Sequence, residues 1–97
     1  MAESARRLIY RVHAIERMVE RGISDDDVQQ VLGAGKEIES YPADFPYPSR
    51  LMLGWCGDRA LHVVAADNAA DNETIIVTVY EPDPSRWQPG FERRKTQ

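Results

Sequence analysis

The chain has 97 residues, of which 42% are apolar and 29% charged, with one cysteine and a formal net charge of −4. This length predicts a single domain over residues 1–97, since folding units commonly hold about 100–150 residues. No apolar run approaches the roughly 20 residues that a membrane-spanning helix needs, and the N-terminal residues lack the apolar stretch of a secretory signal. A lone Cys56 excludes an internal disulfide, so we expect a cytoplasmic protein.

The acidic total conceals an uneven distribution of charge. Residues 1–24 carry five arginines against three glutamates, and residues 86–97 carry four basic groups against one acidic group. Residues 25–85 carry only three basic groups against twelve acidic ones. Because phosphate binding depends on local clusters of basic side chains, the two basic ends keep RNA among the expected partners.

Two short helices are predicted over about residues 12–33. The first covers about residues 12–21, where apolar and polar side chains separate onto two faces, and Gly22 is a natural left-handed stop. Ser24 can cap the second helix, and the three aspartates that follow favour the positive end of the helix dipole. The glycines from Gly33 onward are expected to end it. The apolar face of the first helix comprises Ala14, Ile15, Met18 and Val19.

From Lys36 onward the apolar residues recur with a period of two, which predicts strands. Gly57-Asp58 suits a two-residue hairpin loop. Residues 74–81 are the richest in β-branched side chains and are expected to form the central strand. The order of elements predicts an α+β fold with two N-terminal helices packed on a four-stranded antiparallel sheet over about residues 36–81, followed by an irregular C-terminal extension, 82–97. The strands are expected at 36–41, 50–56, 59–66 and 74–81.

The hairpin also assigns the side chains of its two strands to faces. If Cys56 opposes Arg59, then Leu53 opposes His62. Both faces are largely apolar, and two helices cover only one of them, so the other face is expected to stay partly open as a binding surface. One face holds Leu51, Leu53, Trp55, Ala60, His62 and Val64, and the other holds Met52, Gly54, Cys56, Leu61, Val63 and Ala65.

The first candidate site is a polar stripe on the first predicted helix. His13, Arg17 and Arg21 are spaced i, i+4, i+8. An imidazole moves protons near neutral pH, and guanidinium groups bind phosphate through two hydrogen bonds, so this combination suits the cleavage of phosphodiesters. Glu16 and Glu20 interleave with the arginines, and the stripe is equally consistent with ordinary surface ion pairs.

Further candidates lie on the predicted strands. His62 follows apolar residues, where a histidine is either a catalytic group or a buried side chain with satisfied hydrogen bonds. Thr78 and Tyr80 share a face, so a hydroxyl and a phenol project together, and a tyrosine there either contacts phosphate and bases or is an ordinary strand aromatic. The aromatic and proline-rich residues 41–48 form either an exposed contact surface or a packed loop at a sheet edge.

Other motifs are absent from the sequence. It contains no glycine-rich phosphate loop and no G-x-S-x-G or H-E-x-x-H motif, so no cofactor is expected. Cys56, His13 and His62 are too few for a closed metal site. Trp87 and Phe91 are expected to anchor the C-terminal segment.

Residues 13–24 resemble the opening signature of a family of small prokaryotic proteins of unassigned function, H-A-x-x-R-M-x-x-R-G-I-S. The resemblance extends through the strands to residues 82–87 and Phe91. This family is similar to RelE-like ribonuclease toxins of the barnase-like fold group, and its members are often encoded beside a zinc-finger antitoxin of the YgiT or MqsA type. The resemblance implies a metal-independent RNA-cleaving site with His13, Arg17, His62 and Tyr80 as catalytic residues and Arg21, Thr78 and Arg86 as substrate-binding residues.

We therefore expect a toxin-like ribonuclease that cuts RNA by general acid–base chemistry. One of His13 and His62 takes the proton of the 2′-hydroxyl, and the other protonates the leaving 5′-oxygen. Arg17 stabilises the charge that develops on phosphorus, and Tyr80 orients the phosphate or a base. The alternatives are a non-catalytic interaction module, which binds a protein partner through its acidic surface and residues 41–47, and a homodimer formed through an exposed sheet edge.

Overall fold

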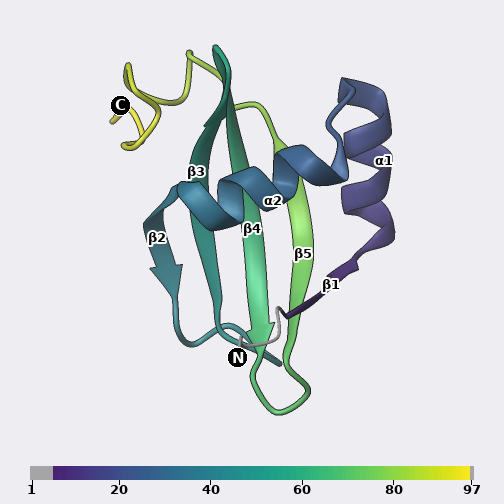
Figure 1. Ribbon diagram of the computed structural model, residues 1–97. Coiled ribbons are helices and arrows are strands. Elements are labelled where there is room, and N and C mark those ends of the chain that lie inside the picture. The colour runs from purple at the N-terminus through teal and green to yellow at the C-terminus, as the bar shows by residue number, and fades with distance from the viewer. Residues whose placement is uncertain (1–5, 97) are drawn as a thin grey trace.

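The computed structural model describes residues 6–96 and contains two helices and a five-stranded sheet. The strand order is β1-β5-β4-β3-β2, in which β1 runs parallel to β5 and all other neighbours are antiparallel. Helix α2 crosses the sheet over β3 and β4, and α1 packs beside β5 (Figure 1). The elements are β1 (Arg7–Tyr10), α1 (Val12–Arg21), α2 (Asp25–Ala34), β2 (Lys36–Tyr41), β3 (Ser49–Cys56), β4 (Arg59–Asn68) and β5 (Glu73–Tyr80).

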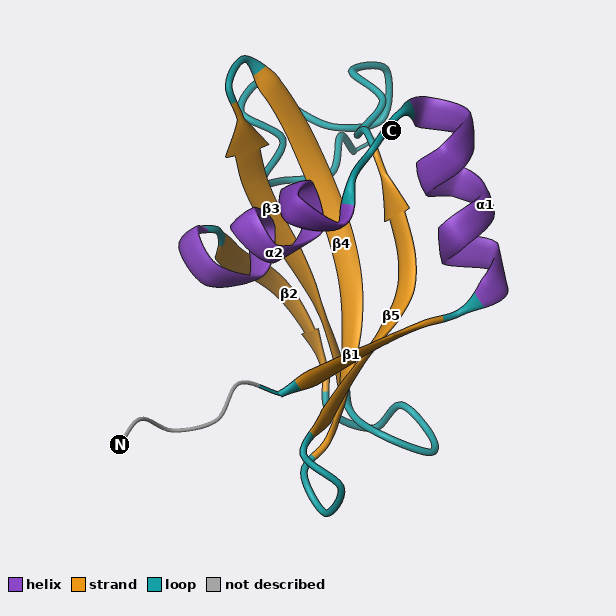
Figure 2. Ribbon diagram, turned by 45° about the vertical axis from the view of Figure 1, so that its right-hand side comes forward, coloured by secondary structure: helices purple, strands orange, loops and turns teal. Residues whose placement is uncertain are grey.

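The α+β class is confirmed, but the predicted four-stranded antiparallel sheet is incomplete. The additional strand β1 precedes the helices, leads directly into α1 and pairs in parallel with β5 (Figure 2). A strand of four residues is too short to show the alternation of apolar and polar side chains in the sequence. Its pairing partner, β5, is the last strand of the chain. The prediction that the β-branched strand is central is wrong, because β5 lies between β1 and β4, whereas β4 occupies the middle of the sheet.

Helix α1 has the predicted bounds and ends at Gly22, whose φ of 64° lies in the left-handed region. Its predicted apolar face is only half correct. Ala14 and Met18 pack toward the core, whereas Ile15 and Val19 are 47% and 78% exposed. The physical reason is position, because a helix packed against one strand near the edge of the sheet buries only a narrow part of its surface.

Helix α2 begins with the predicted cap and continues past its predicted end. The Ser24 hydroxyl accepts a hydrogen bond from the Asp27 backbone N–H, and the Asp27 carboxylate accepts one from the Ser24 backbone N–H, each at 3.0 Å. The helix passes through Gly33 and ends at Ala34. It lies close to β3 because that strand has a glycine at the crossing, Gly54, where an added Cβ would stand 2.8 Å from the Cα of Val31.

The predicted hairpin register is confirmed, since Leu53 opposes His62. It directs one set of side chains toward the helices, where they form the core. The opposite face is not left bare, because the segment after β5 folds back over it and buries Trp87 to 4% exposure. No helix within residues 6–96 is long and apolar enough to span a membrane. The core comprises Ala14, Ile23, Val28, Val31, Met52, Leu61, Val63, Ala65, Ile76 and Val79.

Candidate functional site

A cleft of about 550 Å³ involves α1, the end of β5 and the C-terminal segment. Four of the seven residues that the sequence singled out line it, although they come from three separate parts of the chain. The cleft lies on the side of β5 that does not face the core. Its lining residues are Arg17, Thr78, Tyr80, Glu81, Asp83, Arg86, Trp87 and Arg94.

A bulge in β5 helps to place the strand residues at this cleft. Val64 pairs with Thr78 and Ala65 with Ile76, so Val77 is an extra residue in the ladder. Val77 and Thr78 are consequently both half-buried instead of alternating between core and surface. Tyr80 then emerges on the same side as Thr78. Bulges of this kind commonly redirect side chains beside functional sites.

His62 contacts Tyr80, a lining residue of the cleft, but does not line the cleft itself. The side chain is fully buried, with Nδ1 3.2 Å from the Tyr80 phenol oxygen and Nε2 2.9 Å from the backbone carbonyl oxygen of Phe91. A carbonyl only accepts, so Nε2 carries the proton and Nδ1 accepts the proton of Tyr80. Desolvation lowers the pKa of His62 and raises that of Tyr80, so both are neutral at pH 7. The structure therefore places His62 as a buried partner of Tyr80.

The C-terminal segment is held in place by Trp87 and Arg94. The Trp87 ring packs edge-on to the His62 ring at 4.5 Å between centroids, and the Arg94 guanidinium lies 4.6 Å above the Trp87 ring. Arg94 also donates two hydrogen bonds, of 2.9 and 3.1 Å, to the carboxylate of Glu39. These hydrogen bonds lower the pKa of Glu39. Arg94 is thus already committed to an ion pair that fastens this segment to β2.

Arg17 and Arg86 are the available cations of the cleft. Within residues 6–96, neither has a carboxylate at ion-pair distance. The nearby Glu81 carboxylate is bound by Arg59 at 2.7 Å, and that of Asp83 accepts a backbone hydrogen bond that lowers its pKa. The cleft therefore offers two unpaired guanidinium groups together with the Tyr80 and Thr78 hydroxyls.

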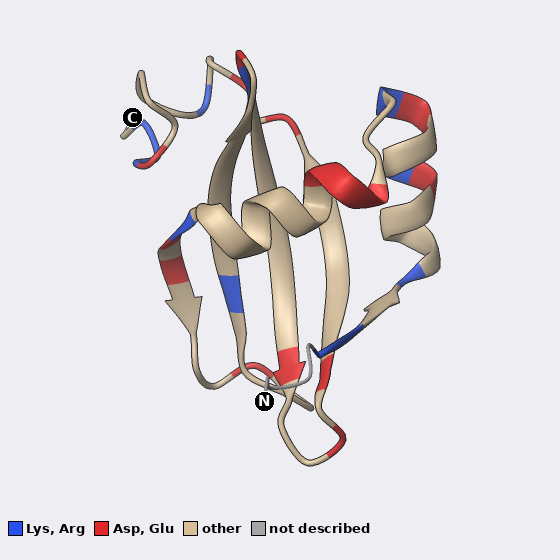
Figure 3. Ribbon diagram, in the orientation of Figure 1, with Lys and Arg blue, Asp and Glu red and all other residues tan. Residues whose placement is uncertain are grey.

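The remaining predicted residues lie outside this lining. His13 and Arg21 are exposed one turn before and one turn after Arg17 on the same side of α1. The ion pairs that the sequence left open, with Glu16 and Glu20, do not form among residues 6–96. Both signs of charge alternate along α1, and the acidic first turn of α2 lies close to it (Figure 3).

Sequence reasoning missed Arg94 as a lining residue and treated it only as part of a basic tail. Its neighbour in space, Trp87, was expected as an anchor, and its burial confirms this. The backbones of Trp87 and Arg94 form an isolated β-bridge, which no local sequence pattern predicts.

The loop over residues 42–48 is partly an exposed contact surface and partly a packed loop, the two alternatives that the sequence left open. Phe45 is 94% exposed, whereas the Tyr47 hydroxyl accepts a hydrogen bond from Asn68.

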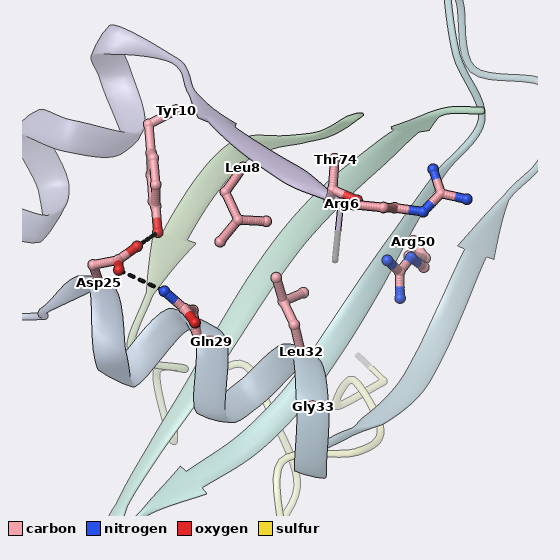
Figure 4. A pocket seen from close by; sticks show the side chains of 9 residues that line it. All are labelled: Arg6, Leu8, Tyr10, Asp25, Gln29, Leu32, Gly33, Arg50 and Thr74. Carbon is pink, nitrogen blue, oxygen red and sulfur yellow. Dashed lines mark hydrogen bonds between the residues drawn. The ribbon is translucent and has the colours of Figure 1, made fainter. Parts of the chain in front are cut away.

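A second and larger hollow, of about 680 Å³, lies between β1 and α2 and includes none of the seven predicted site residues (Figure 4). No group of three or more His, Cys, Asp or Glu side chains within residues 6–96 is arranged to hold a metal ion.

Comparison with known proteins gives a family match and no more. Neither the curated proteins nor the solved structures contain a match to the chain. Residues 10–81 match a family described as a domain of unknown function, DUF4258. This segment covers α1 through β5 and includes every predicted site residue except Arg86. Because the match spans well over half of the sequence, the chain belongs to the DUF4258 family.

Proposed function

We propose that this chain is an RNA-cleaving enzyme of the RelE-like toxin kind, and that the cleft beside Tyr80 holds the scissile phosphate. One observation carries the proposal. Two guanidinium groups without ion-pair partners in residues 6–96, those of Arg17 and Arg86, share one open cleft with the hydroxyls of Thr78 and Tyr80. Guanidinium groups bind phosphate through paired hydrogen bonds, and unpaired ones do so without first losing a partner.

Tyr80 is the group that we assign to the first proton transfer. Its own proton is directed to His62, so the phenol oxygen acts as an acceptor toward a bound ligand. The 2′-hydroxyl of RNA gives its proton to Tyr80 while the phenol proton passes to His62 Nδ1. The 2′-oxygen then bonds to phosphorus. His62 acts through Tyr80 here, which explains how a fully buried histidine can contribute.

The second proton transfer is assigned to His13. When the bond between phosphorus and the 5′-oxygen breaks, the leaving oxygen takes a proton from the imidazole of His13, one helical turn from Arg17. Arg17 and Arg86 neutralise the negative charge that builds on the phosphoryl oxygens. The products are a 2′,3′-cyclic phosphate and a free 5′-hydroxyl.

The test uses a short single-stranded RNA labelled at one end, with purified wild type, Arg17→Ala and Arg86→Ala. Each substitution removes a charged hydrogen bond worth about 1.5–3 kcal/mol and should weaken binding roughly 10–100-fold. Arg93→Ala is the matched control, because Arg93 is exposed and does not line the cleft. Equal binding by wild type and both cleft variants would overturn the phosphate assignment.

Cleavage is tested separately with the same RNA carrying one 2′-deoxy nucleotide. We expect wild type to leave a cyclic phosphate product and to bind the deoxy substrate without cutting there. Tyr80→Phe should retain binding and lose cleavage. If wild type binds RNA but never cuts it, the chain is an RNA-binding module and the catalytic part of the proposal fails.

A second candidate function, binding a protein partner, is favoured by an apolar stripe on α1. Val12, Ile15 and Val19 are 71%, 47% and 78% exposed, on a part of the helix that no other element of residues 6–96 covers. Exposed stripes of this kind favour protein contacts, and a toxin of this class would offer one to its antitoxin protein. Co-expression with the neighbouring gene product tests it. A complex that survives purification with wild type and is lost with Val19→Glu supports the candidate, whereas formation of a homodimer points to self-association instead.

A further inference from the structure

The larger hollow lies on the other side of the sheet from the proposed RNA site. Figure 4 shows it between β1 above and α2 below, with β5 and β3 behind. Its volume of about 680 Å³ falls within the range of small-molecule sites, which hold roughly 300–1,000 Å³. The lining residues are Arg6, Leu8, Tyr10, Asp25, Gln29, Leu32, Gly33, Arg50 and Thr74.

Gly33 forms part of one wall of this hollow. Glycine weakens a helix relative to alanine, and it is usually retained where a neighbour leaves no room for a side chain. At Gly33, however, an added Cβ would meet no atom within 4 Å. Within residues 6–96, no neighbour therefore requires a glycine here, and the exposed backbone of Gly33 leaves this wall of the hollow open.

The two ends of the hollow differ in chemistry. At one end, the Tyr10 hydroxyl donates to one oxygen of Asp25, and the Gln29 amide N–H donates to the other at 2.6 Å. The Tyr10 proton and one of the two Gln29 N–H protons are used, so the Tyr10 oxygen and the Gln29 carbonyl remain as acceptors, and the second Gln29 N–H remains as a donor. This end is therefore suited to a ligand edge that carries N–H or O–H donors beside an acceptor.

The opposite end is basic. Figure 4 shows the guanidinium groups of Arg6 and Arg50 together at this end, away from Asp25. Arg50 is bound to Asp67 at 3.0 and 3.2 Å, whereas Arg6 has no ion pair within the described chain. Between the two ends, the half-buried side chains of Leu8 and Leu32 supply an apolar middle.

We propose that this hollow binds a nucleoside monophosphate, with its phosphate on Arg6 at the basic end, its base between Leu8 and Leu32, and the N–H groups of the base on Gln29 and Tyr10. The site is independent of the proposed RNA cleft and stands or falls without it.

The test is a calorimetric titration of the wild-type chain with GMP, AMP, CMP and UMP, with guanosine and inorganic phosphate as separate probes. We expect at least one monophosphate to bind with a Kd below about 1 mM. Guanosine and phosphate should each bind at least tenfold more weakly, because each reaches only part of the site.

Two variants locate the binding. Gly33→Leu places a side chain against the open wall and should weaken the monophosphate at least tenfold, and Arg6→Ala should weaken it at least fivefold without changing the Tm. Arg93→Ala, outside the hollow, is the control and should bind as wild type does. The proposal is overturned if no monophosphate binds, if phosphate alone binds equally well, or if both variants bind as tightly as wild type.

Discussion

The close contact between α2 and β3 makes Gly54→Ala the sharpest test of the fold. An added Cβ would stand 2.8 Å from Val31 Cα and 2.9 Å from Val31 Cγ2. Carbon atoms in contact prefer about 3.5–4.0 Å, so α2 must move away from the sheet by roughly 1 Å. Overpacking of this kind costs about 1–3 kcal/mol. In a chain of this size, each kcal/mol shifts the Tm by about 4–8 °C, so we expect a fall of roughly 5–20 °C.

Gly33→Ala, in helix α2, provides the matched control. Its Cβ meets nothing within 4 Å, and alanine favours the helix by about 0.5–1 kcal/mol, so the Tm should rise by roughly 2–8 °C. Urea and thermal unfolding followed by far-ultraviolet circular dichroism measure both free energies of unfolding. The packing of α2 on β3 described above is refuted if Gly54→Ala is as stable as wild type, or if the two substitutions change stability in the same direction.

Three further changes probe the core and the C-terminal segment. The free energy of unfolding should fall as the pH drops below about 6.5, because burial lowers the pKa of folded His62 and the unfolded chain then binds a proton that the folded chain does not. The slope due to this group is at most about 1.4 kcal/mol per pH unit. It should be absent from the stability curve of His62→Gln, measured by urea titration between about pH 8 and pH 5, so subtracting that curve from the wild-type curve isolates it. Trp87→Ala should lower the free energy of unfolding by about 3–5 kcal/mol, measured by thermal unfolding, because its ring is buried against His62. It should also accelerate amide hydrogen exchange after residue 82, and unchanged exchange would show that the ring does not hold this segment in place. Leu61→Ala, at a fully buried position in β4, should cost about 2–5 kcal/mol, and a loss below about 1 kcal/mol would contradict its central place in the core.

Much of the fold could be predicted because its signals are local. The helix stop at Gly22 needs only a left-handed residue, and the cap at Ser24 needs only a hydroxyl three residues before a carboxylate. The hairpin turn at Gly57 sets the register of β3 and β4, and with it the side of the sheet on which every residue of both strands lies. Each of these features is decided within a few residues, so the pattern is visible in the chain.

The candidate site was predictable in its residue types and only partly in its arrangement. Arg17 and Tyr80 were singled out because phosphate chemistry needs a guanidinium and a proton-transferring group, and they do share a cleft. The orientation of His62 could not be read from the sequence, since an apolar strand suits both a buried and an exposed histidine. Its burial depends on Trp87, which reaches it only after the segment beyond β5 has folded back over the sheet.

The sequence by itself determined the local elements of this protein: two capped helices, a β-hairpin with a defined register and the charges at either end of the chain. The tertiary structure alone decided which elements meet. It paired β1 with β5 across more than sixty intervening residues, left Ile15 and Val19 exposed, and committed Arg94 to Glu39. The physical reason is that these outcomes depend on long-range contacts, whose free energy arises only when distant segments bury surface against one another.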